Sequence, residues 1–151
     1  MAHDHPFIIQ LHAAFEDAHC YHFVLEYASN GSLTLWLTKQ LSERIAKLVA
    51  AEALAALGHL HSLGIVHRDL KPDNVLVRAT GHIVLADFGV SKRLRGGASS
   101  PVTKGACSMV GTPGFIAPEV LLQQWKPSTS CKATSTYTYE PDFYALGVLL
   151  H

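Results

Sequence analysis

The sequence predicts an α+β fold, in which short strands and helices share one hydrophobic core. Three observations predict it. Apolar, strand-like stretches occupy 7–28 and recur over 75–85. Between them, apolar residues repeat near the 3.6-residue helical period from Ile45 to Leu63, and a second apolar helix is expected from Asp142 onward. With 151 residues, the chain has the size of one ordinary domain.

The first two strands are predicted from "FIIQLHAAF" (7–15) and "YHFVLEYA" (21–28), which a polar turn at 16–19 connects. The next residues, Asn-Gly-Ser at 30–32, break the strand pattern and can cap a short helix over 33–37. This part of the chain therefore reads as a hairpin followed by a helical turn.

A long helix follows, with clear signals at both ends. Ser42 is a suitable N-cap, and Glu43 stands at the positive end of the helix dipole. Gly64 is well placed to end the helix. A second hairpin is predicted from 75–78 and 82–85, which turns at Ala-Thr-Gly.

Two polar stretches separate the remaining elements. Residues 93–104 are rich in Gly, Ser and Lys, and residues 126–141 form a Ser/Thr-rich segment that we interpret as a surface insertion. Asp142, directly after Pro141, is expected to open the final apolar helix, "DFYALGVLLH".

Composition excludes several classes of function. The formal net charge is zero and Lys and Arg are spread along the chain, so no nucleic-acid partner is expected. No apolar run is long enough to insert into a membrane, and the N-terminal residues do not resemble a signal peptide. The three cysteines, Cys20, Cys107 and Cys131, form no CxxC pair. We expect free thiols in a reducing compartment, the cytoplasm with the nucleus as the alternative. The ten histidines are scattered and predict no structural metal site.

The charged segment "HRDLKPDN" (67–74), together with "ADFG" (86–89), carries the chemistry. Asp69 and Asp87 lie on either side of the predicted hairpin, so the fold can bring both carboxylates to one cleft. Asn74 and Asp87 offer the oxygen ligands that Mg²⁺ prefers. Asp69 is then left to accept the proton of a substrate hydroxyl, and Lys71 to contact a phosphate. This division of roles is the one that phosphoryl transfer requires.

Four motifs in order carry a resemblance: "HRDLKPDN", "DFG" (87–89), "GTPGFIAPE" (111–119) and "DFYALG" (142–147). The chain resembles the catalytic domain of the eukaryotic protein kinases. "DLKPDN" and the "GT" before "APE" are similar to the serine/threonine type, and residues 5–33 are similar to the AGC group.

The resemblance implies a partial protein kinase fold over 5–151, truncated at both ends. Residues 5–28 would be the remnant of the small lobe and hinge, and 29–151 an incomplete large lobe that carries the insertion. It also implies ATP and Mg²⁺ as cofactors, and a protein substrate with a Ser or Thr hydroxyl.

The resemblance also assigns roles to residues. Leu25 would be the gatekeeper, Glu26 and Ala28 would offer hinge backbone groups to adenine, and Leu76 would form the floor under the ring. The catalytic set would be Asp69, Lys71, Asn74 and Asp87, with Asn74 and Asp87 as the Mg²⁺ ligands. Asp142 would brace the catalytic loop from below. His67, Phe88 and Leu11 would stack between the lobes.

A regulatory site follows from Arg68, a positive charge beside the catalytic Asp that calls for an anion. Family register places a phosphate acceptor three residues before Gly111, at Ser108. Other hydroxyls of the loop are alternatives: Ser99, Ser100 and Thr103. Thr112 is the poorer candidate, because the family uses that hydroxyl beside the catalytic Asp and Lys.

The sequence holds no Gly-rich loop, strand-3 Lys or helix-C Glu, which family kinases use around the phosphates. Two interpretations follow. One is a serine/threonine kinase, whose partners would include an upstream activating kinase or a chaperone. The other is a catalytically dead, kinase-like fragment that acts as a binding or regulatory module.

Overall fold

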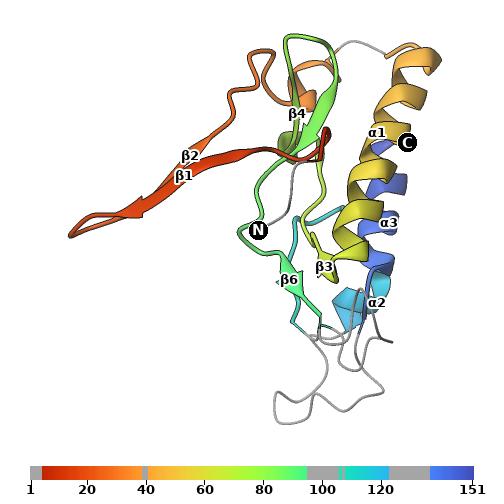
Figure 1. Ribbon diagram of the computed structural model, residues 1–151. Helices are drawn as coiled ribbons and strands as arrows, with labels where there is room; N and C mark the ends of the chain where they lie inside the picture. The colour runs from red at the N-terminus through yellow and green to blue at the C-terminus, as the bar shows by residue number, and fades with distance from the viewer. Residues whose placement is uncertain (1–4, 39–40, 95–105, 107, 123–136) are drawn as a thin grey trace.

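The structure is a computed structural model that describes residues 5–38, 41–94, 106, 108–122 and 137–151 (Figure 1). Several residues named above lie outside this part of the chain: Ser99, Ser100, Thr103, Cys107, Cys131 and the insertion over 126–136. The described elements comprise short strands, one long helix and several shorter helical segments, as expected of an α+β fold.

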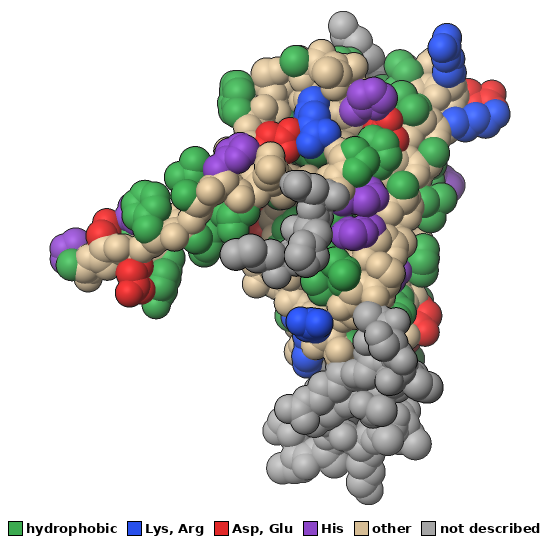
Figure 2. All heavy atoms as spheres, viewed as in Figure 1, with side chains coloured by type: hydrophobic (Ala, Val, Ile, Leu, Met, Phe, Trp, Pro, Cys, Tyr) green, Lys and Arg blue, Asp and Glu red, His purple; other side chains and the backbone are tan. Residues whose placement is uncertain are grey.

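The first hairpin forms an arm that projects away from the rest of the molecule (Figure 1). It pairs β1 (Leu11–Glu16) with β2 (Tyr21–Leu25) in antiparallel register. Asp17 closes the turn, because its carboxylate accepts hydrogen bonds from the backbone N–H groups of His19 at 2.7 Å and Cys20 at 2.8 Å. Both faces of the arm carry exposed apolar side chains. Figure 2 shows apolar side chains along the side of the arm that faces the viewer.

The first strand was expected over 7–15, and this prediction is wrong in its first half because β1 begins at Leu11. Phe7, Ile8 and Ile9 instead run alongside β5 (Ile83–Leu85). The Leu85 N–H donates to the Phe7 carbonyl and the Ile9 N–H donates to the Leu85 carbonyl, each at 2.9 Å. Burial of Ile8 and Ile9 in the core separates this segment from the solvent-exposed arm. The second strand also ends earlier than expected, at Leu25 rather than residue 28.

The long helix is α1 (Glu43–Ser62), and its predicted ends are confirmed. The Ser42 hydroxyl accepts a hydrogen bond from the Ile45 N–H at 3.4 Å, and Gly64 adopts a φ of 74° just past the helix. That left-handed conformation is cheap only for glycine. The short helix before it, η1 (Leu33–Leu35), has Ser32 at its N-cap position as expected, although the Ser32 side chain makes no capping hydrogen bond.

The second hairpin is confirmed as β4 (Val75–Val77) paired with β5, turning at Gly81 with a φ of 86°. It lies against α1, and the final helix α3 (Glu140–Leu149) also packs against α1, with its buried side chains in the same core cluster. Helix α3 begins two residues before the expected Asp142. Pro141 fits its first turn, because proline lacks only an N–H that would be unpaired there.

Three shorter elements complete the described fold. They are β3 (Ile65–Val66) paired with β6 (Lys92–Arg93), the helical turn η2 (Pro72–Asn74), and α2 (Pro118–Leu121). The main core gathers apolar side chains of α1, both strands of the second hairpin, α3 and the loop after β3: Val49, Ala53, Ala56, Leu57, Leu60, Leu70, Val75, Val77, Ile83, Leu85, Ala145, Leu146 and Leu149. The charged loop 67–71 rests directly on this core through Leu70.

Glu52 fastens the second hairpin to α1 from within this core. Its side chain is buried, and its carboxylate accepts hydrogen bonds from the Ile83 N–H at 2.8 Å and from His82 Nδ1 at 2.6 Å. We expect Glu52→Ala to lower the free energy of unfolding by about 1–3 kcal/mol, since the buried Ile83 N–H loses its acceptor. Urea-induced unfolding followed by circular dichroism measures the change.

Glu43→Ala is the matched control, because Glu43 lies on the same helix and its exposed carboxylate pairs with exposed Lys47. This change is expected to cost under about 1 kcal/mol. Equal costs for the two variants would contradict the role assigned to Glu52.

The described part of the chain includes no helix that is both long and apolar enough to cross a membrane.

Candidate active site

The charged loop that follows β3 is held from below by α3. The Asp142 carboxylate is almost fully buried and accepts hydrogen bonds from the N–H groups of His67 at 2.9 Å and Arg68 at 2.8 Å. His61 of α1 donates to the same carboxylate through Nε2 at 2.8 Å. Arg68 has a φ of 72°, a backbone conformation that a non-glycine residue adopts only when its surroundings impose it. Asp142 therefore lies where the resemblance implied, as the brace beneath this loop.

Asp69 is the centre of a compact hydrogen-bond network. The Thr112 hydroxyl donates to Asp69 Oδ1 at 2.7 Å, and Lys71 Nζ lies 3.1 Å from Asp69 Oδ2. Lys71 also donates to the Thr112 hydroxyl at 2.7 Å. Asn74 Nδ2 donates to the Asp69 carbonyl at 2.8 Å and to Oδ2 at 3.1 Å.

These partners set the charge of the Asp69 carboxyl. Burial alone would raise its pKa, but the hydrogen bonds from Thr112, Lys71 and Asn74 and the positive charge of Lys71 outweigh it. The pKa of Asp69 is therefore held below its ordinary value, so the group is an anion at neutral pH. An ionised carboxylate at this point can accept a proton or orient a hydroxyl.

Asn74 and Asp87 come from the same end of the second hairpin. Asn74 precedes β4 and Asp87 follows β5, and the Ala86 N–H donates to the Asn74 carbonyl at 2.8 Å. Asp87 is exposed, has a φ of 58°, and receives a hydrogen bond from the Gly89 N–H at 3.1 Å. The predicted convergence of Asp69, Asn74 and Asp87 at one end of the hairpin is thus what the structure shows.

The donor set at this end fits a hard divalent ion bound together with phosphate. The Asn74 amide N–H₂ is used on Asp69, which orients its carbonyl oxygen for another ligand, and Asp87 adds an exposed carboxylate. Mg²⁺ takes one or two such protein oxygens and completes its shell with water and phosphate. Among the described residues, no group of three or more His, Cys, Asp or Glu side chains could hold a metal alone.

His67 and Phe88 form a contact between the charged loop and the segment that follows β5. Their rings are 5.1 Å apart between centroids, and the His67 ring, fully buried, donates through Nε2 to the Ala86 carbonyl at 3.1 Å. Leu11, expected to stack with them, remains about half exposed at the base of the arm and belongs to none of the buried clusters. The stacking of Leu11 on these two rings stays a prediction.

The four predicted adenine-site residues lie around the start of the arm and the second hairpin. Ala28 is buried and packs in one cluster with Val84 and Ala86, against which Leu76 also packs. Leu25 is half exposed at the end of β2. The Glu26 N–H donates to the Gln10 carbonyl at 2.8 Å, and the Ala28 carbonyl accepts from Gly31.

Arg78 is a residue that sequence reasoning missed. Its guanidinium pairs with the Glu26 carboxylate through Nε and, at 2.8 Å, through Nη2, and its Nη1 donates to the Pro6 carbonyl. The hydrogen bonds from Arg78 hold the pKa of Glu26 below its ordinary value, and those to Glu26 raise the pKa of Arg78. This ion pair fastens the segment after β2 to the second hairpin. The two side chains are 52 residues apart, so only the fold reveals the pair.

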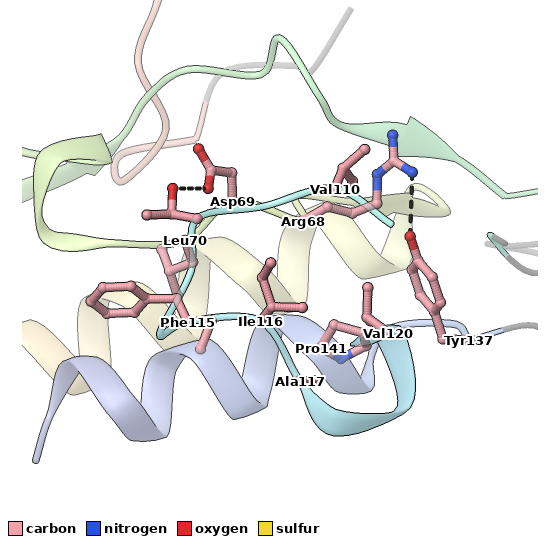
Figure 3. Close-up of a pocket in the computed structure, with 12 residues that line it drawn as sticks. Arg68, Asp69, Leu70, Val110, Phe115, Ile116, Ala117, Val120, Tyr137 and Pro141 are labelled. Atoms are coloured by element: carbon pink, nitrogen blue, oxygen red, sulfur yellow. Dashed lines mark hydrogen bonds between the residues drawn. The ribbon is translucent and has the colours of Figure 1, made fainter. Parts of the chain in front are cut away.

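Arg68 reaches the loop that precedes α2. Its Nη1 donates to the Ser108 hydroxyl at 2.8 Å, and its Nε donates to the Val90 carbonyl at 2.6 Å. Ser108 is exposed. The same Nη1 lies 3.4 Å from the hydroxyl of Tyr137, a residue that the sequence did not single out. Figure 3 draws this contact.

A small pocket lies beneath the loop, between the segment 110–117 and α3 (Figure 3). It is lined by apolar side chains with Asp69, Arg68 and Thr112 at its rim: Leu70, Val110, Phe115, Ile116, Ala117, Val120, Tyr137, Pro141 and Ala145. Gly111, at the start of this segment, has a φ of 122°, and a Cβ there would lie 2.9 Å from the Arg68 carbonyl. The glycine therefore lets this segment approach the charged loop closely.

Comparison with known proteins agrees with this geometry. The family model described as "Protein kinase domain" matches residues 1–151. The serine/threonine-protein kinase Sgk3 of Rattus norvegicus is 40% identical over 149 residues, which cover 97% of this chain and 27% of the relative. The serine/threonine-protein kinase Sgk1 of Homo sapiens is also 40% identical over 149 residues, covering 97% of this chain and 31% of the relative.

This chain thus spans less than a third of the length of these relatives. The match nevertheless runs over nearly all of its own residues, and the motifs that carry it lie at the site described above. The chain belongs to the protein kinase family, with a serine/threonine-type domain of the AGC group.

Proposed function

We propose that this chain supplies the catalytic loop of a serine/threonine protein kinase, which transfers the γ-phosphoryl group of ATP to Ser or Thr hydroxyls of proteins. The observation that carries the proposal is the network around Asp69. Lys71, Thr112 and Asn74 all donate to one carboxylate whose pKa lies below its ordinary value. Such a network holds the carboxylate anionic and in one orientation.

Each residue of the site has a distinct task in this reaction. The Asp69 carboxylate would accept the hydrogen of the substrate hydroxyl and aim its oxygen at the phosphorus. Lys71 would place a positive charge where the transferred group gains negative charge. Thr112 is hydrogen-bonded to both Lys71 and Asp69, and would hold these two side chains in a fixed relative position.

ATP and Mg²⁺ fit the residues at the end of the second hairpin. Asn74 and Asp87 would hold Mg²⁺, which neutralises the charge of the phosphates when bound. The Glu26 carbonyl and the Ala28 N–H would meet the adenine, with Leu76 under the ring and Leu25 beside it. The packing of Leu76 in the cluster with Ala28 supports this arrangement.

A chimeric kinase tests the proposal directly. Residues 5–151 would replace the matching segment of human Sgk1, and transfer of ³²P from labelled ATP to a mixture of Ser- and Thr-containing peptides would be measured. We expect phosphorylated peptide in amounts that depend on Mg²⁺. A well-folded chimera that binds ATP but transfers no phosphate would instead support the second interpretation, a catalytically dead binding module.

We also propose that Ser108 is a regulatory phosphorylation site. The contact between Arg68 Nη1 and the Ser108 hydroxyl supports it, because a phosphate on that oxygen would lie within reach of the guanidinium. An upstream kinase would form the Oγ–P bond and break the bond from the γ-phosphorus to the bridging oxygen of ATP, releasing ADP and a proton. The Arg68–phosphate pair would then hold the loop against the catalytic segment.

A double-mutant cycle in the chimera tests this regulatory site. We expect Ser108→Ala and Arg68→Ala each to lower kcat/KM by about tenfold or more, because each removes one partner of a charge-assisted pair. The double variant should cost little more than either alone, since the two changes break one interaction. Steady-state kinetics after treatment with an upstream kinase provide the measurement. Full activity of Ser108→Ala would contradict the proposal.

The remaining partners and the location follow from composition and family. We propose a cytoplasmic protein whose partners are a protein substrate, ATP, an upstream activating kinase and a chaperone. The three cysteines, which form no CxxC pair, support a reducing compartment.

A further inference from the structure

Tyr137 joins the end of the chain to the loop that carries Ser108. It lies just before α3, and its backbone N–H and carbonyl exchange hydrogen bonds with Ala106 at 3.0 and 2.9 Å. Its side chain is 4% exposed and belongs to a cluster of small and aliphatic side chains: Val66, Leu94, Ala106, Ala117 and Val120. Backbone hydrogen bonds therefore hold the Tyr137 main chain in place, and packing in this cluster holds its ring.

The Tyr137 hydroxyl stands at the edge of this cluster and contacts both parts of the proposed regulatory site. It donates to the Ser108 carbonyl at 2.6 Å and lies 3.4 Å from Arg68 Nη1, from which it accepts. The first bond fixes the backbone of Ser108. The second, longer contact acts on the nitrogen that also donates to the Ser108 hydroxyl.

Arg68 is restrained at its other end as well. Its Nε donates to the Val90 carbonyl at 2.6 Å, so the guanidinium is held at Nε by the backbone and at Nη1 by Tyr137 and Ser108. Restraining a long, flexible side chain before its ligand arrives removes part of the entropy that binding would otherwise cost. Packing alone does not require the hydroxyl, because a phenylalanine ring would fill the same cluster.

We propose that Tyr137 is a positioning residue, whose hydroxyl presets the Ser108 backbone and the Arg68 guanidinium to receive a phosphate on Ser108. This inference rests on the proposed regulatory role of Ser108. Once the phosphate is present, the Ser108 carbonyl stays on Tyr137, which keeps the phosphate oxygens facing Arg68. The loop and the catalytic segment are then joined through a residue that touches neither substrate nor nucleotide.

The test uses the 151-residue chain with phosphoserine incorporated at position 108 during synthesis, so that no upstream kinase is needed. Phosphorus NMR then follows the second ionisation of the phosphate as pH is varied. Its pKa is ordinarily about 6, and a well-placed guanidinium lowers it. We expect the phosphate pKa to be lowered in the parent chain. In Tyr137→Phe, which keeps the buried ring, the phosphate pKa should rise back toward its ordinary value by at least half of that shift. If Tyr137 acts through packing alone, the phosphate pKa of Tyr137→Phe should equal that of the parent chain.

Two further variants separate the outcomes. Tyr144→Phe removes a hydroxyl from a half-exposed tyrosine of α3 and should leave the phosphate pKa as in the parent. Arg68→Gln should abolish the shift. If Arg68→Gln abolishes it but Tyr137→Phe matches the parent, the role of Tyr137 is overturned while the Ser108 site stands. If Arg68→Gln changes nothing, the Ser108 site itself is overturned, and the role of Tyr137 with it. Circular dichroism confirms that each variant is folded.

Discussion

Asp69→Asn is expected to lower kcat by about 10²–10⁴-fold in the chimeric kinase, the range for loss of a positioned general base. The amide keeps the shape of the side chain but removes the negative charge that Lys71 and Thr112 hold in place. Binding of ATP depends on other residues of the site, so KM for ATP should change far less than kcat. Initial rates at several ATP concentrations separate the two parameters.

Asp73→Asn is the matched control for this experiment, four residues further along the same loop. Asp73 is exposed, and its carboxylate accepts from the Thr34 hydroxyl at 3.0 Å rather than joining the Asp69 network. Its replacement should leave kcat close to that of the parent. A chimera that keeps its kcat in Asp69→Asn would contradict the assignment of Asp69 and direct the search for the base elsewhere.

Asp142→Ala should have the largest effect on stability, lowering the free energy of unfolding by about 3–5 kcal/mol, because several hydrogen-bond donors lose one buried carboxylate acceptor. It would leave three groups without this acceptor: the buried N–H group of His67, the partly buried N–H group of Arg68, and the His61 ring. Kinase activity should fall as well, because the loop that carries Asp69 loses its support. Chemical denaturation and the peptide kinase assay measure the two effects.

Asp142→Asn gives an intermediate case. Its single carbonyl oxygen can accept from one of the two loop N–H groups, while its amide N–H₂ would face the other, so its cost should lie between those of the parent and Asp142→Ala. Glu140→Ala, on the same helix, removes an exposed carboxylate that accepts hydrogen bonds from Thr138, and it should cost about 1 kcal/mol or less. Equal losses for Glu140→Ala and Asp142→Ala would show that the helix end matters rather than the contact to the loop.

The candidate site could be predicted well because its chemistry lies in short, local stretches. Asp69, Lys71 and Asn74 are within six residues of one another, and Asp87 follows a hairpin whose turn brings its two ends together. Once β4 and β5 pair in register, Asn74 and Asp87 must meet at the same end. The proximity of Ser108 to Arg68 was also expected, and the structure contains that contact.

Predictions were less accurate where an element touches a distant part of the chain. Residues 7–15 have the composition of one strand, yet the segment divides because Ile8 and Ile9 are buried against β5 while Leu11 continues into the exposed arm. The hydrophobicity of a segment does not by itself show whether it forms a strand of an exposed arm or packs against the core.

By itself, the sequence determined the family, the motifs of the charged loop, and the local elements whose signals lie within a few residues: the Ser42 cap, the turns at Gly64 and Gly81, and the periodic face of α1. Only the tertiary structure decided which side chains hold the site in place. Arg78 meets Glu26, Asp142 meets the loop at His67, and Tyr137 meets Ser108, each across tens of residues. A hydrogen bond needs its two atoms within about 3 Å, and for residues so far apart in sequence that distance is set by the packing of the whole core rather than by any local pattern.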